Sequence, residues 1–187
     1  MPKNRQGTRV LASLSCLFAA LCSAGAYISL PIPVSPVPLA LTNLFVVLGG
    51  LLLGPAWGAL SSIAYVALGA LGLPVFSNGR GGIAYLAGPT GGYLAGYIAG
   101  AALSGLLAAK GGRKGIVLGS AVGFFSILAL GSCDLAMIQG LGWSRAIAVG
   151  ILPFLPGDTL KTILAALVAK RLRPFIESLS GEAIESR

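Results

Sequence analysis

The last long apolar segment of the chain contains an acid and a base. Between Arg145 and Lys170 the only charged residues are Asp158 and Lys161. A charged side chain inside a hydrocarbon layer costs roughly 2.5 kcal/mol or more, so such residues are rare there and usually functional. Three residues apart on a helix, the two side chains share one face. We expect this pair to form part of a binding site; the alternative is a mutually neutralising ion pair that locks helices together.

A third charge without an obvious positional reason lies in the irregular segment 72–89. This residue is Arg80, and Asn78 is close to it in sequence. Arg80 and Lys161 together favour an anionic ligand group, whereas Asp158 and Asn78 can accept hydrogen bonds from N–H donors. A ligand with a carboxylate at one end and amide-like N–H groups at the other would satisfy all four residues. The alternative for Arg80 is an arginine that only faces solvent.

Aromatic residues near these groups are candidates for the wall of an apolar middle section. Tyr and Trp at helix ends are also typical of the membrane–water interface, so both interpretations stay open. The candidates are Trp57, Phe76, Tyr85, Tyr93 and Trp143.

The composition identifies a membrane protein. The chain is 56% hydrophobic and 10% charged, with a mean hydropathy of +0.90, whereas soluble domains carry about 25% charged residues. No charged residue occurs between Arg9 and Arg80, which leaves room for about three spans at roughly 20 residues each. We predict a single integral membrane domain over residues 1–187.

The basic residues predict the topology. Most of them fall in three clusters separated by apolar sequence, an arrangement that marks the cytoplasmic side of spans and argues against nucleic acid as the partner. Between two clusters on the same side the chain crosses an even number of times. We predict an all-α bundle of six transmembrane helices with both termini cytoplasmic, over residues 10–30, 39–53, 56–71, 90–109, 116–130 and 146–169. The clusters are Lys3, Arg5 and Arg9; Lys110, Arg113 and Lys114; and Lys170, Arg171 and Arg173.

The first predicted helix carries a stripe of small residues at four-residue spacing: Ala12, Cys16, Ala20 and Ala24. Such stripes let helices approach closely, either inside one bundle or against a partner membrane protein, and both remain open.

Several kinds of chemistry lack their usual residues. The chain has no histidine, and its three cysteines have neither metal nor redox spacing, so we expect no metal and no cofactor. Walker and nucleophile-elbow motifs are also missing. We therefore expect a binding subunit that is not an enzyme and that draws its energy from elsewhere.

Three stretches together carry a family resemblance. They are residues 72–76 (Gly-Leu-Pro-Val-Phe), 88–93 (Gly-Pro-Thr-Gly-Gly-Tyr) and 154–161 (Phe-Leu-Pro-Gly-Asp, ending in Lys161). In this order and spacing they resemble the BioY family, the biotin-specific substrate-binding S components of energy-coupling-factor (ECF) transporters. The resemblance covers nearly the whole chain.

The resemblance implies the S-component fold in a bacterial cytoplasmic membrane, with biotin bound near the outer face beneath the first and third outer loops. It also implies a transmembrane T component and two ATPases as partners, the T component contacting small residues of the first helix. Family members are similar in holding biotin with an outer-loop asparagine and arginine and with an aspartate and a lysine of the last helix. By position these correspond to Asn78, Arg80, Asp158 and Lys161, and Tyr85 and Tyr93 are expected to join them.

One departure from the family pattern concerns the start of the second helix. After a Val-Pro pair the family usually has Thr and then Gln, whereas Ala40 and Thr42 occupy those polar positions here, and Asn43 is a candidate to compensate. Two rival functions also stay open. One is a secondary transporter that moves a small vitamin or organic anion without an ATPase, and the other is an intramembrane enzyme that uses Asp158 and Lys161 as acid and base.

Overall fold

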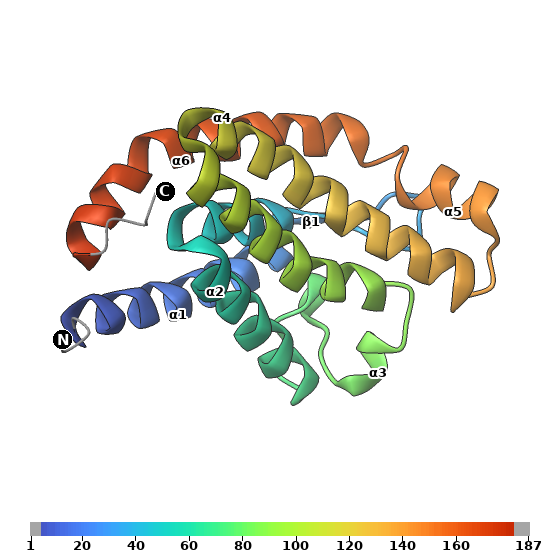
Figure 1. The fold of residues 1–187 in the computed structure, drawn as a ribbon. Coiled ribbons are helices and arrows are strands. Elements are labelled where there is room, and N and C mark those ends of the chain that lie inside the picture. Colours follow the sequence, from blue (N-terminus) through green and yellow to red (C-terminus); the bar gives the residue numbers. More distant parts are fainter. Residues whose placement is uncertain (1–4, 182–187) are drawn as a thin grey trace.

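The computed structural model describes residues 5–181, which form a bundle built mainly of helices (Figure 1). Its four long helices are α1 (Arg5–Tyr27), α2 (Thr42–Ala70), α4 (Gly91–Met137) and α6 (Leu155–Ser180). The connecting segments hold three short helices, namely η1 (Ser77–Gly79), α3 (Ile83–Leu86) and α5 (Trp143–Gly150). Two short strands, β1 (Ser29–Leu30) and β2 (Leu39–Ala40), pair antiparallel between α1 and α2.

Helix α2 is two helices joined by a reversal of the chain. Gly54 has φ +82°, a conformation open to glycine because it lacks a Cβ atom, and Pro55 cannot donate the next helical hydrogen bond. Beyond the reversal the backbones touch: a Cβ atom on Gly58 would lie 2.5 Å from the Gly50 Cα. The predicted turn between helices 39–53 and 56–71 is confirmed. The first of them begins only at Thr42, because β2 takes the two residues before Leu41.

Helix α4 is likewise a helical hairpin, reversed at Gly112 (φ +52°). Its halves meet through glycine. A Cβ atom on Gly96 would lie 2.9 Å from the Ile127 Cα, and one on Gly100 would lie 2.8 Å from the Gly123 carbonyl oxygen. The glycine stripe therefore serves close helix packing. The predicted helices 90–109 and 116–130 correspond to these halves, and the second half continues to Met137.

The last predicted helix, 146–169, is wrong as a single element. The chain forms α5 and then α6, with a bend of 57° at the break between them. Two prolines account for the break: Pro153 lies within it, and Pro156 is the second residue of α6. Proline is tolerated in the first turn of a helix because the N–H groups there have no helical partner in any case. Helix α6 then continues to Ser180, well beyond the predicted end at residue 169.

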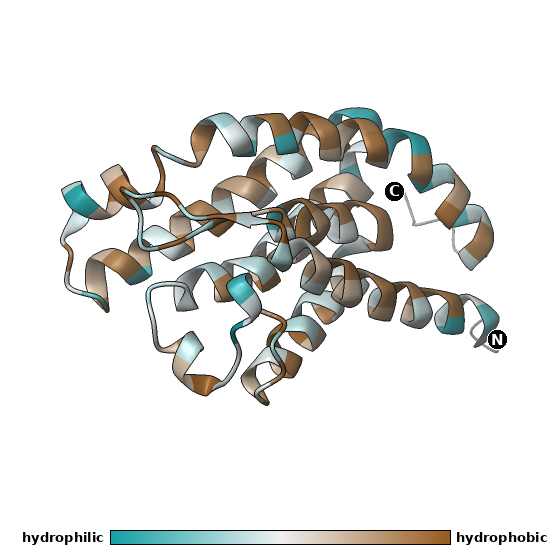
Figure 2. Cartoon of the chain, turned by 180° about the vertical axis from the view of Figure 1, so that it is seen from behind, coloured by the Kyte–Doolittle hydropathy of each residue, from teal (hydrophilic) through white to brown (hydrophobic). Residues whose placement is uncertain are grey.

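The protein is a multi-pass membrane protein. By length and hydropathy α1, α2 and α4 are each long enough to cross a membrane, and α5 with α6 makes one further broken span. Because α2 and α4 double back, these elements provide six apolar helices, the number predicted. Figure 2 shows apolar colour along all of them, with hydrophilic residues recurring toward the ends of the bundle.

The bundle has two distinct ends. The start of α1, the bend of α4 and the last turns of α6 lie at one end, and α3 and α5 lie at the other (Figure 1). The described basic clusters follow this division, since Lys110 and Lys114 flank the bend of α4 and Lys170 lies in the second half of α6. Lys3 lies outside the described residues.

Candidate ligand-binding site

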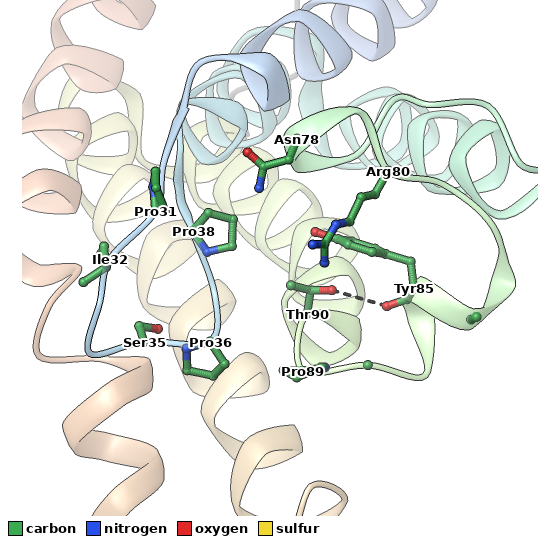
Figure 3. A pocket seen from close by; sticks show the side chains of 12 residues that line it. Pro31, Ile32, Ser35, Pro36, Pro38, Asn78, Arg80, Tyr85, Pro89 and Thr90 are labelled. Atoms are coloured by element: carbon green, nitrogen blue, oxygen red, sulfur yellow. Dashed lines mark hydrogen bonds between the residues drawn. The ribbon is translucent and has the colours of Figure 1, made fainter.

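A cavity of about 350 Å³ lies between two irregular segments at the end of the bundle that holds α3. One wall is the proline-rich loop between β1 and β2, and the other is the segment from η1 to the start of α4 (Figure 3). This volume falls within the range of roughly 300–1,000 Å³ typical of small-ligand sites. We call it the outer cavity; its lining residues are Pro31, Ile32, Ser35, Pro36, Pro38, Asn78, Arg80, Ala84, Tyr85, Gly88, Pro89 and Thr90.

A tight turn presents Asn78 and Arg80 to the outer cavity. The backbone N–H of Phe76 donates to the Arg80 carbonyl oxygen at 2.8 Å, which closes the turn. Asn78 lies in the left-handed region with φ +61°, which asparagine tolerates better than most residues. The hydroxyl of Ser29, in β1, donates to the Asn78 side-chain oxygen at 3.4 Å and links the two walls. Two side chains predicted from sequence therefore share one cavity.

Tyr85 lines the outer cavity, and Phe76 is packed behind it. Phe76 is fully buried, and its ring packs directly on Gly69 of α2, where a Cβ atom would lie 2.1 Å from the ring. The ring of Tyr85 stacks on Phe76 with centroids 4.9 Å apart. The predicted site residue Tyr85 is therefore positioned by packing that reaches down to the backbone of α2.

A second, much smaller cavity shares Pro38, Tyr85 and Thr90 with the outer cavity. Its volume is about 20 Å³, room for about one water molecule. We call it the inner cavity; half of its ten lining residues are aromatic, and they are Tyr65, Phe76, Tyr85, Tyr93 and Tyr97. Tyr93 is buried and donates its hydroxyl to the Gly150 carbonyl oxygen at 2.8 Å, so α5 fixes its position.

Asp158 and Lys161 form a buried ion pair in the first turns of α6. They are 3% and 8% exposed, and the Lys161 ammonium donates to Asp158 Oδ1 at 3.0 Å. Lys161 also donates to the Ala40 carbonyl oxygen, in β2, at 2.8 Å. The second carboxylate oxygen, Oδ2, is buried and has no hydrogen-bond partner. The pair thus retains an unused acceptor.

The structure groups the predicted site residues in two sets. Asn78, Arg80 and Tyr85 line the outer cavity, and Tyr93 lines the inner one. Asp158 and Lys161 line neither of these cavities. The segment 38–40 separates the sets, because its proline lines both cavities while its alanine accepts from Lys161.

The altered start of the second helix is explained in part by its contacts. Ala40 contributes its backbone carbonyl to Lys161, and Thr42 donates its hydroxyl to the Cys22 carbonyl oxygen of α1 at 3.2 Å. Asn43 is buried. Positions that are polar in the family therefore serve packing and backbone hydrogen bonds here.

Sequence reasoning missed Pro38, Ser35 and Tyr97 as lining residues. The proline-rich residues 31–38 form the first outer loop, beneath which the resemblance implies the ligand site, and they line one wall of the outer cavity. Thr90 occupies the N-cap position of α4, but its hydroxyl donates to the Tyr85 carbonyl oxygen at 3.3 Å and makes no capping hydrogen bond. Trp57 and Trp143 lie outside both cavities.

The small-residue stripe of α1 faces away from the bundle. Cys16, Ala20 and Ala24 are exposed and Ala12 is half-buried, while α1 packs on α2 and α6 through its other face. Within residues 5–181, no three metal-binding side chains of the His, Cys, Asp or Glu type lie together.

Comparisons with known proteins agree on one family. A model of the BioY family matches residues 2–178. "Biotin transporter BioY" of Thermotoga maritima is 46% identical over 167 residues, covering 84% of this chain and 92% of its own. "Probable biotin transporter BioY" of Pyrococcus horikoshii is 43% identical over 161 residues, covering 86% and 94%.

A solved structure resembles the whole bundle. It is a crystal structure of the S component for biotin from an ECF-type ABC transporter, with a TM-score of 0.83 and 28% identity. The match covers 93% of this chain and 95% of the other. The S-component fold expected from the sequence is thereby confirmed, and the chain belongs to the BioY family.

Proposed function

We propose that this protein captures biotin for uptake as the substrate-binding subunit of an ECF-type transporter. The observation that carries the proposal is the outer cavity lined by Asn78, Arg80 and Tyr85, in a chain whose relatives are named biotin transporters. The cavity opens between loops rather than between helices, as expected of a site that captures a ligand before it crosses the membrane.

The chemistry of the site complements the ligand. The carboxylate of biotin pairs with the guanidinium of Arg80, an arrangement in which two N–H donors meet two oxygens. The ureido N–H groups find an acceptor in the unpartnered Oδ2 of Asp158. Between these ends the sulfur-containing ring packs against Tyr85 and Tyr93. Lys161 neutralises Asp158 and adds a donor.

Binding requires the segment 38–40 to move. The inner cavity is too small for a ring system, and this segment separates it from the ion pair. A shift of the proline-rich loop joins the cavities and releases the Lys161 ammonium from the Ala40 carbonyl, so the ligand replaces a contact that the protein makes with itself. The loop then closes over the ligand.

The proposed partners are a transmembrane T component and two ATPases. The exposed stripe Cys16, Ala20 and Ala24 on α1 supports a T component as a neighbour, because it lets another helix approach closely. We place the protein in a bacterial cytoplasmic membrane with both termini inside, supported by the basic residues gathered at one end of the bundle. It has no catalytic role in this proposal.

The test is titration calorimetry of the purified protein with biotin. The unaltered protein is expected to bind biotin, and a failure to bind would rule out the function. Uptake by the chain without ATPases would instead favour the secondary transporter, and turnover of a ligand would favour the enzyme.

Variants of the ion pair test the site. Asp158→Asn keeps the side-chain volume and removes the charge, and we expect it to weaken biotin binding about tenfold or more, the scale of a charge-assisted hydrogen bond. Lys161→Ala is expected to do the same, and it also leaves Asp158 buried without its partner, so its thermal unfolding must be measured alongside. Lys170→Ala, an exposed lysine on the same helix, is the control and should bind normally. Unimpaired binding by both ion-pair variants would exclude the pair from the site.

A further inference from the structure

Asp134 is an acidic side chain that the proposed biotin site does not use. It lies in the last turn of α4. The two ion pairs among residues 5–181 involve Asp158 and Glu177, so Asp134 has no cationic partner there. Its Oδ2 atom is buried and has no hydrogen-bond partner. A buried carboxylate oxygen without a donor is unfavourable, so its surroundings need an explanation.

Asp134 lies in a groove of about 380 Å³ between the two halves of α4. Apart from this carboxylate the groove is lined by apolar and small side chains. The aspartate fits because its neighbour across the groove is Gly92, where a Cβ atom would lie 2.3 Å from the Asp134 Cβ. The other lining residues are Gly91, Ala95, Leu130, Cys133, Met137 and Ile138.

The groove faces away from the biotin site. Tyr93 and Leu135 of the α4 hairpin are buried in the bundle, whereas Ala95, Leu130 and Met137 in the groove are exposed. The groove is also near one end of the bundle, because Gly91 begins α4 and Met137 ends it. In a multi-pass membrane protein, an outward apolar groove at a helix end meets the lipid close to the headgroups.

We propose that this groove binds a phospholipid with an ethanolamine headgroup. The positively charged ammonium of ethanolamine carries N–H donors, which match the negative charge of the Asp134 carboxylate that lines the groove. The apolar groove takes the upper part of an acyl chain. Phosphatidylcholine has the same charge on nitrogen but no N–H, so it cannot donate a hydrogen bond to this carboxylate and serves as the matched comparison lipid.

The experiment measures lipid retention. The purified full chain is placed in nanodiscs containing equal amounts of phosphatidylethanolamine and phosphatidylcholine with identical acyl chains, and the lipids that stay bound are counted by native mass spectrometry. We expect the unaltered protein to favour phosphatidylethanolamine about tenfold, the equivalent of roughly 1.4 kcal/mol. Equal retention of the two lipids, or a preference for phosphatidylglycerol in a parallel mixture, would overturn the proposal.

Two variants separate the lipid site from folding. Asp134→Asn removes the charge and is expected to abolish the preference, whereas Ala95→Phe fills the groove and is expected to lower retention of both lipids. Leu103→Phe adds bulk to an exposed position of α4 outside the groove and should behave as the unaltered protein. Thermal unfolding of each variant checks the fold without reference to biotin. A preserved preference in Asp134→Asn would show that this carboxylate does not bind the lipid.

Discussion

Arg80 is the cation in the outer cavity, and its role can be separated from that of Lys161. Its side chain is exposed in the cavity wall and takes part in neither of the ion pairs found within residues 5–181. Lys161 is buried and already bonded to the protein. A ligand must therefore displace a hydrogen bond within the protein to reach Lys161, whereas a carboxylate can reach Arg80 without displacing an ion pair.

We predict that Arg80→Gln removes discrimination between biotin and biotin amide. The unaltered protein should bind the charged ligand about tenfold more tightly, because an arginine–carboxylate pair is stronger than a neutral hydrogen bond. In the variant the two ligands should bind alike. Calorimetry with both ligands measures this, with Arg113→Gln, at the opposite end of the bundle, as the control. Discrimination that survives in Arg80→Gln would assign the carboxylate to another residue.

At the scale of elements, the sequence predicted most of the helices and their turns but not the strands, nor the division of the last predicted helix into α5 and α6. Composition and charge spacing reveal apolar spans, and Gly54-Pro55 marks a reversal locally. The pairing of β1 with β2 depends on two residues in each strand, too few to produce an alternating pattern. The separation of Asn78 from Asp158 by the segment 38–40 was equally hidden, because the path of a loop depends on tertiary contacts.

Helix α2 supports the cavity through a single glycine. Phe76 packs on the bare backbone of Gly69, and the Gly69 carbonyl oxygen also accepts from the backbone N–H of Gly82 at 2.7 Å. We predict that Gly69→Ala displaces Phe76 and with it the stacked Tyr85, at a cost of about 1–3 kcal/mol of stability. Biotin affinity should fall in parallel.

Thermal unfolding and calorimetry on the same sample measure both effects. Gly111→Ala is the matched control, since a Cβ atom there would meet no atom within 4 Å. A Gly69→Ala protein with unchanged stability and affinity would show that Phe76 is free to move without disturbing the site.

At the scale of the whole molecule, the two ends of the bundle differ in charge and in shape. The end with the bend of α4 carries basic residues, and the other carries the cavity (Figure 1). The predicted topology places the cavity outside the cell. In a cysteine-free background, Ile83→Cys, which replaces a side chain that is 77% exposed, should react with a membrane-impermeant maleimide on intact cells. Lys114→Cys should react only after permeabilisation, and the reverse pattern would invert the topology.

The exposed stripe of α1 gives a second prediction at this scale. Ala20→Leu adds bulk in the middle of the stripe and should reduce co-purification with a T component about tenfold or more, because close helix approach is lost. Biotin binding should be unchanged, since this side chain points away from the bundle. Val117→Leu, at an exposed position of α4 and therefore on another helix, is the control. Undiminished co-purification of Ala20→Leu would place the partner elsewhere.

The shortness of the first half of α2 has a consequence for how the chain enters a bilayer. Residues 42–53 rise about 18 Å at 1.5 Å per residue, whereas the hydrocarbon layer is about 30 Å thick. This half is too short to be recognised as an independent span during synthesis, so it must be inserted together with the half beyond Gly54. The backbone that leads into this half needs partners within the protein wherever water does not reach it. Leu41 solves this by donating its N–H to α1, and the Ala40 carbonyl receives the ammonium of Lys161.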